Sequence, residues 1–360
     1  MEMSKVAVEA VVEVASDVTV HGMIAFATAC VGYAAVSATR ADAAAESSRA
    51  MMEMLTTGAV DGTSALVFPL MLSAMLLAMY FLFAYIGVFV ALVAIGYAVA
   101  GLILFLHAAI VAAGWAPLMA LASPLPIPPW PLPRGYVALG LALAAGWLGY
   151  GGWVLNNALA AGMVVLVVTL MRLPNLKIGY ALLLGLVVFD VAWVFYSAPV
   201  FGDNVMVKVA TSEAVNPART VATSLSLPGR LLAYIPRKLP MINKLVVPYS
   251  DGRGYAMLGL GDLALPGVLL AFGLRMDRKL GKRVRPSLSL RTYFGCALAA
   301  YYAGLWLALV ASRMMRHPQP ALLYLVPATL AAISLRGLVA GELRALWQAK
   351  PLVAADGPPV

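Results

Sequence analysis

Residues 65–113 read ALVFPLMLSAMLLAMYFLFAYIGVFVALVAIGYAVAGLILFLHAAIVAA. This run contains no Lys, Arg, Asp or Glu. A bilayer core about 30 Å thick is crossed by about 20 apolar residues in a helix. The run is therefore too long for a single crossing, and we predict two membrane spans that meet near residues 84–87.

The composition of the whole chain agrees with a membrane protein. Its 360 residues are 62% hydrophobic and 11% charged, with a mean hydropathy of +0.90, whereas a soluble domain is about half apolar and about a quarter charged. These values predict an all-α polytopic membrane protein and exclude soluble, disulfide-rich secreted, collagenous, coiled-coil and disordered classes. The net charge of +9 indicates membrane topology and no nucleic-acid partner, because Lys and Arg gather between the apolar runs.

A scan for apolar runs predicts nine spans. Their approximate bounds are 20–38, 65–83, 86–112, 136–152, 154–171, 178–200, 255–274, 292–312 and 319–340. The proline-rich segment 116–134 is expected to be extended, because proline cannot donate a helical hydrogen bond. A polar loop, 201–254, follows the sixth span, and a basic cluster, 275–291, follows the seventh. An acidic segment precedes the first span, so we expect no cleavable signal peptide.

The orientation follows from counting Lys and Arg on each side of the membrane. With the N-terminus outside, the inner loops carry 15 of these residues. The outer segments carry 3 when the long loop 201–254, to which the rule applies weakly, is left out. We therefore predict a lumenal N-terminus and a cytosolic C-terminus.

Two acidic residues fall inside predicted spans, Asp190 mid-way along the sixth and Asp262 in the seventh. An ionisable side chain in hydrocarbon is costly, so its presence there is a functional hypothesis. No Lys or Arg stands at a matching depth in the sequence. We predict that the two carboxyl groups share a proton, one acting as a base and the other as a hydrogen-bond donor. Water-mediated peptide hydrolysis requires this division of roles.

Glycine and proline residues accompany these carboxylates. Gly259 and Gly261 remove side chains where another backbone must come close. Pro266 leaves the carbonyl of Asp262 without its helical donor, which is tolerable only beside protein or water. In the ninth span Pro320 suits a first helical turn. We expect a strained helix start at that point.

The same carboxylates are compatible with other functions. A proton- or cation-coupled transporter is the second hypothesis, and a non-catalytic scaffold or leak channel is the third. A transporter is expected to show internal repeats with matched broken helices, and the two halves of this sequence show none. No His, Cys and Glu cluster has metal-binding spacing, and no glycine-rich loop with Lys indicates a nucleotide. Neither a metal nor a cofactor is predicted.

Three short motifs fall in the sixth, seventh and ninth predicted spans: FD at 189–190, GLGD at 259–262 and QPAL at 319–322. Flanking segments of matching kind are WVF at 193–195, NVMVKVAT at 204–211 and LLYLVP at 322–327. Together they resemble the signal peptide peptidase family, the intramembrane GxGD aspartyl proteases. Segments 204–211 and 310–313 are most similar to the signal peptide peptidase-like 3 branch. The strong resemblance covers about 175–347.

The resemblance implies a presenilin-like fold with nine spans and a protease in which Asp190 and Asp262 are catalytic. By the same resemblance, the residues that bind substrate or support the site are Phe189, Gly259, Gly261, Gln319, Pro320, Ala321 and Leu322. Members of the family usually have Tyr before the first catalytic Asp. The hydroxyl missing from Phe189 puts the pH optimum and the rate in question more than catalysis itself.

The resemblance also implies single-span substrates of type II orientation, and no obligatory protein partner, while homo-oligomers are compatible with it. It implies a location in the endomembrane system, in the Golgi, the ER or endosomes. The expected organisation has four parts: a lumenal segment (1–19), an N-terminal bundle of five spans (20–174), a catalytic region of four spans (175–347) with the lumenal loop 201–254, and a cytosolic tail (348–360).

Overall fold

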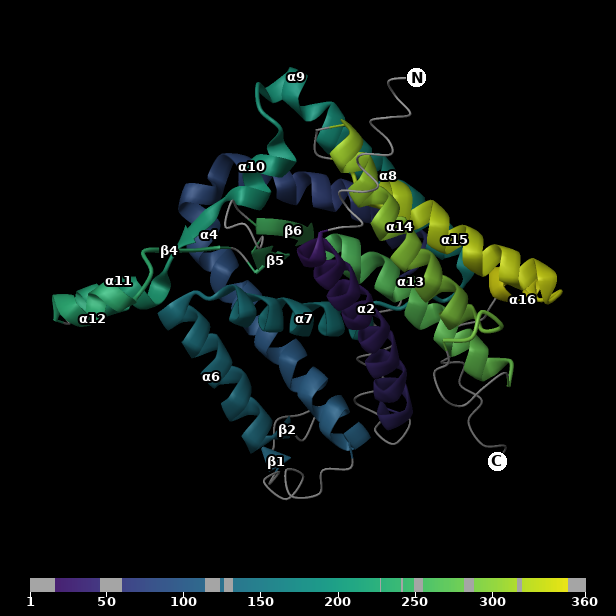
Figure 1. Cartoon of the computed structure of the whole chain (residues 1–360), viewed down its shortest axis with the longest axis horizontal. Coiled ribbons are helices and arrows are strands. Elements are labelled where there is room, and N and C mark those ends of the chain that lie inside the picture. The colour runs from purple at the N-terminus through teal and green to yellow at the C-terminus, as the bar shows by residue number, and fades with distance from the viewer. Residues whose placement is uncertain are drawn as a thin grey trace.

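The computed structural model describes residues 17–45, 60–113, 124–125, 132–226, 228–240, 242–248, 255–281, 288–315 and 319–348. The expected lumenal segment and cytosolic tail lie almost wholly outside these residues. Within them, long helices form the body of the protein (Figure 1). The long helices are α2 (Val18–Ala45), α4 (Gly62–Ala113), α6 (Arg134–Tyr150), α7 (Trp153–Leu170), α8 (Leu176–Phe195), α13 (Leu260–Lys279), α14 (Tyr293–Met315) and α15 (Leu322–Val339).

The remaining elements are short. The short helices are α9 (Ser197–Phe201), α10 (Val205–Thr211), α11 (Pro217–Ser224), α12 (Gly229–Tyr234) and α16 (Leu343–Trp347). The strands are β1 (Pro124–Leu125), β2 (Leu132–Pro133), β3 (Glu213–Val215), β4 (Lys238–Pro240), β5 (Lys244–Pro248) and β6 (Tyr255–Gly259). Each strand pairs antiparallel with one neighbour, β1 with β2, β3 with β4 and β5 with β6. The β1–β2 pair agrees with the extended conformation predicted for the proline-rich segment.

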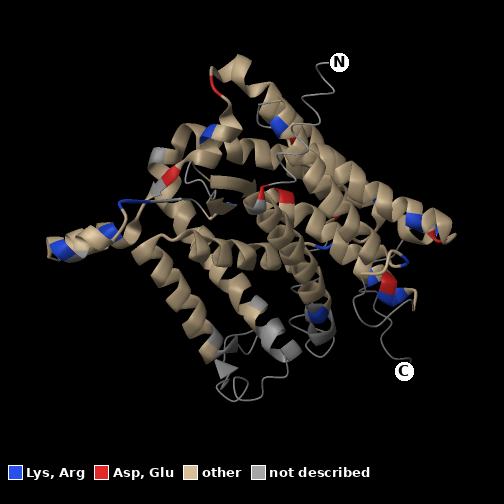
Figure 2. Ribbon diagram, in the orientation of Figure 1, with Lys and Arg blue, Asp and Glu red and all other residues tan. Residues whose placement is uncertain are grey.

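The described residues confirm an all-α polytopic membrane protein. Seven of their segments are long and apolar enough to cross a bilayer, and Figure 2 shows the charged residues mostly at helix ends and in loops. The predicted count of nine is not reached for two reasons. The apolar part of α6 is short, from Val137 to Tyr150, and α13 carries charged residues along its length, Asp262 in its first turn and Arg275, Asp277, Arg278 and Lys279 toward its end.

Helix α4 differs from the predicted pair of spans. It is hydrogen-bonded as one helix through residues 84–87, although two of the seven candidate spans lie in it, Gly62–Phe83 and Tyr85–Leu104. Figure 1 shows its two halves running in different directions. The first half packs on α8, where Trp193 Nε1 donates to Ser73 Oγ at 3.0 Å. The second half packs on α7, so the two candidate spans have different packing partners without a break in the helix.

A glycine contact joins α4 to α7. A Cβ atom added to Gly101 would lie 1.8 Å from the carbonyl oxygen of Gly162, and one added to Gly162 would lie 2.6 Å from the Leu102 nitrogen. The two backbones therefore touch, and only glycine fits at both positions. Small residues let membrane helices approach in this way, so that dispersion contacts and backbone dipoles hold them together.

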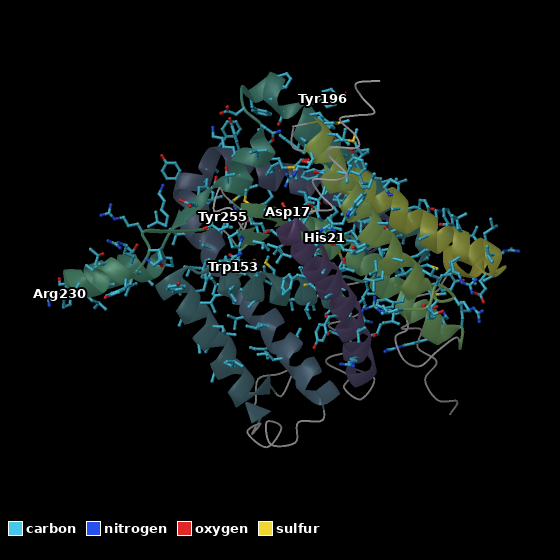
Figure 3. The ribbon with its side chains drawn as sticks, in the orientation of Figure 1. Asp17, His21, Trp153, Tyr196, Arg230 and Tyr255 are labelled. Carbon is cyan, nitrogen blue, oxygen red and sulfur yellow. The ribbon has the colours of Figure 1, made fainter. Side chains whose placement is uncertain are left out.

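Helix α2 lies beside α13 and α7 in the bundle. Its first turn is closed by Asp17, whose Oδ1 accepts the backbone N–H of Thr19 at 2.9 Å. Asp17 Oδ2 also lies 3.5 Å from Arg313 Nη2 near the end of α14. Figure 3 shows Asp17 and His21 together at this end of α2. The contact ties the first span to the C-terminal group of helices.

The predicted seventh span is wrong at both ends. Residues 255–259 form strand β6, and α13 runs to Lys279, into the segment predicted as a basic loop. Five apolar residues are compatible with either a strand or a helix, and pairing with β5 decides for a strand. At the other end, the extra turns of α13 contain the buried Asp277. Its carboxylate accepts the backbone N–H groups of Tyr293 and Phe294, each at 2.9 Å, and so starts α14.

Candidate active site

Asp190 lies on the buried face of α8. The buried residues of this helix are Leu176, Gly179, Leu182, Leu183, Leu186 and Asp190. Their spacing of three and four residues defines one stripe of a helix. Asp190 is 3% exposed, so the stripe that packs the helix into the bundle also turns this carboxylate inward.

The position of Asp190 along its helix differs from the prediction. It stands five residues before the end of α8 at Phe195, not mid-way along a span. The predicted span included residues 197–200, which belong to the separate short helix α9. Pro199 accounts for the interruption, because it has no N–H to donate to the carbonyl of Phe195.

The partner of Asp190 is the start of α15. The backbone N–H of Leu322 donates to Asp190 Oδ2 at 3.2 Å. Toward the opposite ends of α8 and α15, the Tyr180 hydroxyl lies 2.7 Å from Ser334 Oγ. These two contacts show that α8 and α15 run antiparallel, with Asp190 opposite the first helical residue of α15. Leu322 has no helical acceptor for its N–H at this position, so the amide is free to serve the carboxylate.

The prediction that Pro320 lies in the first turn of the ninth helix is therefore wrong. Gln319, Pro320 and Ala321 precede α15, and its first residue is Leu322. Pro320 is buried, and its carbonyl accepts the N–H of Leu323 at 3.2 Å. A proline cannot donate from its own nitrogen, so the helix does not extend backward through Pro320. The segment delivers one backbone N–H to Asp190.

Asp262 lies in the first turn of α13, directly after strand β6. Gly259 is the cap of this helix, and a Cβ atom added to it would lie 3.2 Å from Asp262 Oδ2. The carboxylate therefore turns back over the glycine at the helix start. Gly261 is exposed and has no atom within 4 Å of an added Cβ atom. The two glycines have different surroundings, one crowded by the carboxylate and one open.

Two asparagines of α7 hold the hairpin that places Asp262. Asn157 Nδ2 donates to the Val246 carbonyl at 2.8 Å, and the Val246 N–H donates to Asn157 Oδ1 at 2.9 Å. Asn156 Nδ2 donates to the Lys244 carbonyl at 3.0 Å. Helix α7 thus occupies the free edge of β5. The sequence analysis missed these residues, although two buried amides inside an apolar span were the signal.

The two carboxyl groups lie within electrostatic range of each other. Asp190 is close enough to act electrostatically on Asp262, and α15 packs against both α8 and α13. Tyr301 of α14 is also within electrostatic range of Asp262. This tyrosine is fully buried, and no described residue hydrogen-bonds its hydroxyl. A buried hydroxyl without a partner calls for an explanation. None of the sequence motifs indicated this polar group near Asp262.

The fold brings some of the predicted site residues into contact, in two pairs. Asp190 and Leu322 are in direct contact, and Asp262 and Gly259 are in direct contact. Phe189 is half-buried beside Asp190 on α8 and makes no polar contact. Gln319 is half-buried, and its Oε1 lies 3.5 Å from the Tyr324 hydroxyl, so it braces the start of α15.

Comparison with known proteins agrees with these motifs. The family model described as signal peptide peptidase matches residues 52–352. A rice protein named signal peptide peptidase-like 1 is 44% identical over 232 residues, which are 60% of this chain and 62% of that protein. An Arabidopsis thaliana protein of the same name is 42% identical over 230 residues, which are 60% of this chain and 61% of that protein. No solved structure matches the chain.

The expected signal peptide peptidase-like 3 branch is one of several branches among the matched relatives. A rice protein named signal peptide peptidase-like 3 is 36% identical over 198 residues, covering 55% of this chain and 33% of that protein. The proteins named signal peptide peptidase-like 1 are more similar to this chain. The matched segments span about three fifths of those first two relatives.

Proposed function

Because this chain belongs to the signal peptide peptidase family, we propose that it is an intramembrane aspartyl endopeptidase that cleaves type II single-span membrane proteins. The observation that carries the proposal is the hydrogen bond from the Leu322 N–H to Asp190 Oδ2, together with the electrostatic effect of Asp190 on Asp262. Two carboxyl groups that act on each other support a shared-proton pair better than two independent side chains. The relatives' names support hydrolysis of peptide bonds, and the apolar helices support a membrane location.

In this mechanism the aspartate pair, Asp190 and Asp262, binds one water molecule. One carboxylate takes a proton from the water as its oxygen attacks the scissile carbonyl carbon. The other carboxylic acid donates a hydrogen bond to the developing oxyanion. The Leu322 N–H orients Asp190 Oδ2, which leaves the second oxygen of that carboxyl group for the water. The pair titrates as a unit, so the two roles belong to the pair.

The substrate helix must unwind before its peptide bond can enter such a site. The carboxylates lie near the end of α8 and near the starts of α13 and α15, so all three helices bring backbone ends to the site. Helix ends leave N–H and C=O groups without helical partners. Gly261 and the Gln319 to Leu322 segment are the proposed walls of a groove that receives an extended peptide.

Substrate orientation tests the proposed function. A groove built from protein backbone distinguishes the two directions of a peptide, and the charge count predicts that α13 runs from lumen to cytosol. For one reporter span presented in both orientations, we expect the type II form to be cleaved about tenfold faster or more, which is about 1.4 kcal/mol. The measurement is the initial rate for both reporters in the same proteoliposomes.

The matched control is a reporter with the same span except that leucines replace the residues of its cleavage region and keep that region helical. It should be resistant in both orientations, because the site accepts only unwound chain. Faster cleavage of the type I form would show that the proposed topology or substrate class is wrong. Proton-driven transport of a small solute without any cleavage would favour the transporter hypothesis.

The two glycines of the GLGD motif, Gly259 and Gly261, should respond differently to replacement by alanine. Gly259→Ala places a methyl group 3.2 Å from Asp262 Oδ2, so the carboxylate must shift and kcat should fall about tenfold. Gly261→Ala meets no protein atom, so it should chiefly raise KM by intruding on the substrate. Steady-state kinetics with one reporter separates the two effects.

Gly22→Ala on α2 is the control for this pair, because an added Cβ atom there also meets nothing within 4 Å. It should leave both constants unchanged. An unchanged kcat for Gly259→Ala would contradict the crowding of Asp262, and an unchanged KM for Gly261→Ala would remove Gly261 from the groove.

A further inference from the structure

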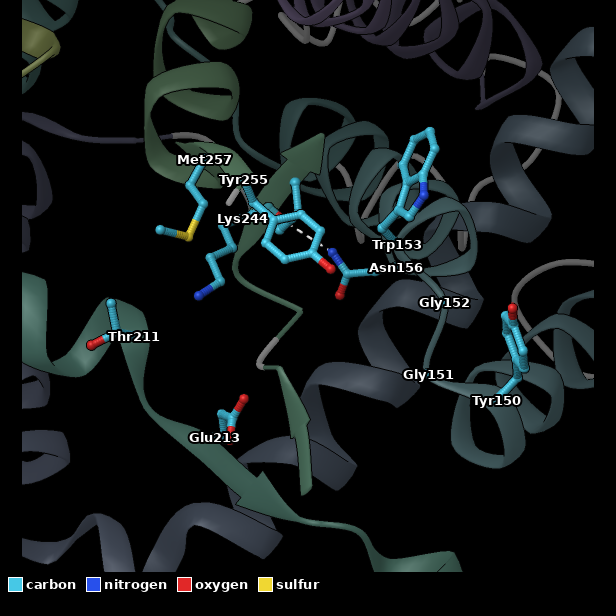
Figure 4. A pocket seen from close by; sticks show the side chains of 11 residues that line it. Tyr150, Gly151, Gly152, Trp153, Asn156, Thr211, Glu213, Lys244, Tyr255 and Met257 are labelled. Atoms are coloured by element: carbon cyan, nitrogen blue, oxygen red, sulfur yellow. Dashed lines mark hydrogen bonds between the residues drawn. The ribbon is translucent and has the colours of Figure 1, made fainter. Parts of the chain in front are cut away.

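A cavity of about 640 Å³ lies beside the β5–β6 hairpin. Its walls come from the turn between α6 and α7, from the start of α7, from Thr211 and Glu213, and from both strands of the hairpin (Figure 4). We call this cavity the hairpin pocket. Its chemistry is set by Asn156, Glu213, Lys244 and Tyr255, which none of the motifs singled out.

Lys244 is the buried charged group in this wall. It is 8% exposed, and its ammonium donates to the Ala210 carbonyl. No ion pair joins it to a carboxylate of the described residues, although Glu213 is near enough to influence it electrostatically. Burial lowers the pKa of Lys244, and the negative charge of Glu213 opposes this change. An ammonium group has three donors, so an additional acceptor in the pocket would relieve its desolvation.

Asn156 offers the complementary group. It is 1% exposed, and its Nδ2 donates a hydrogen bond to the Lys244 carbonyl. Its Oδ1 is buried without a hydrogen-bond partner among the described residues. This oxygen can only accept, so it requires a donor from an occupant. A peptide supplies N–H donors together with carboxylate acceptors, whereas a phosphodiester oxygen is an acceptor only.

The hairpin connects the pocket to the proposed catalytic site. Lys244 is the strand partner of Gly259, the glycine that Asp262 covers. Met257, which also lines the pocket, stands two residues before Gly259. At about 3.3 Å per residue of extended chain, Met257 and Tyr255 lie about 7 and about 13 Å from Gly259 along β6. An extended substrate would reach this region three to five residues from its scissile bond.

We propose that the hairpin pocket binds the flank of the substrate that leaves the bilayer beside β5 and β6, and that it prefers an acidic side chain there. The inference rests on the proposed protease function. With the predicted topology, this flank follows the scissile bond of a type II substrate. The acidic side chain pairs with Lys244, and a backbone N–H of the same segment donates to Asn156 Oδ1. Tyr255 and Trp153, both labelled in Figure 3, also line the pocket.

The test uses fluorescent single-span peptides that differ at one position, with Asp, Asn or Lys placed three, four, five or six residues beyond the cleavage site. Binding is measured to the full chain carrying Asp190→Ala and Asp262→Ala, in phosphatidylcholine nanodiscs, so that no turnover is needed. We expect Asp to bind about tenfold more tightly than Asn at one or two of these positions, as a charge-assisted hydrogen bond allows, and Lys to bind more weakly than Asn.

Variants then assign the preference to the pocket. In the same background, Lys244→Gln should bring the Asp-to-Asn ratio close to one, and Glu213→Gln should increase it, because a competing negative charge is removed. Lys238→Gln is the matched control, since Lys238 is an exposed lysine on β4 outside the pocket, and it should leave the ratio unchanged. Each ratio compares two peptides on one preparation, so it does not depend on how much protein is folded.

Three results would overturn the assignment. They are a ratio near one at every position, a ratio that survives Lys244→Gln, or loss of the preference only when phosphatidylserine competes, which would indicate a lipid headgroup site. Cleavage by the wild-type chain is measured in parallel. Selective binding without any cleavage would retain the pocket and reject the protease, whereas cleavage without selectivity would retain the protease and reject the pocket.

Discussion

Replacing either Asp190 or Asp262 by alanine is expected to lower the rate of reporter cleavage by about 10³-fold or more, while the protein still inserts into membranes. The reason is that the two carboxyl groups perform one proton transfer together, and residues that act as a unit lose nearly all of their effect when one is removed. For the same reason the double variant should be scarcely slower than either single variant. Initial rates in proteoliposomes, normalised to the amount of inserted protein, give the comparison.

Asp277→Ala is an informative control for this experiment. Asp277 is buried like Asp190, but its carboxylate caps α14. Its removal should lower thermal stability, because two buried N–H groups lose their acceptor, and it should leave turnover per folded molecule far less affected than the other two substitutions. Substantial cleavage by Asp190→Ala or by Asp262→Ala would reject the aspartate pair as the catalytic group.

Pro320→Leu is expected to lower kcat by about 10- to 100-fold, a loss typical of small misplacements in an active site. Leucine restores a backbone donor and allows α15 to extend toward residue 318. In an extended helix the Leu322 N–H would bond to the carbonyl four residues earlier and would no longer reach Asp190 Oδ2, 3.2 Å away in this structure. The leucine would also add volume at a buried position. Membrane insertion should be unaffected, because the change is apolar.

Pro327→Leu provides the matched control in the same helix. Pro327 lies inside α15, is exposed, and stands five residues after Leu322, the residue that contacts Asp190. Its replacement should regularise the helix and raise thermal stability without a comparable loss of kcat. If Pro320→Leu cleaved at the parental rate, the start of α15 would have no role in orienting Asp190.

The sequence was sufficient for features that depend on local composition. Membrane insertion depends on the apolar area of each segment, so the all-α membrane class and the positions of most spans could be predicted from residue types alone. An ionisable group in hydrocarbon is costly wherever it packs, which is why Asp190 and Asp262 stood out. The motifs around them were sufficient to indicate the family.

Only the tertiary structure decided features that depend on a distant partner. Residues 255–259 form a strand because they pair with β5, which the asparagines of α7 hold at its other edge. Leu322 serves Asp190 because α8 and α15 pack antiparallel in one register. The buried hydroxyl of Tyr301 and the hairpin pocket likewise exist only where separate segments meet. Such contacts carry little signal in a single sequence, because each residue involved is as compatible with ordinary packing as with a site.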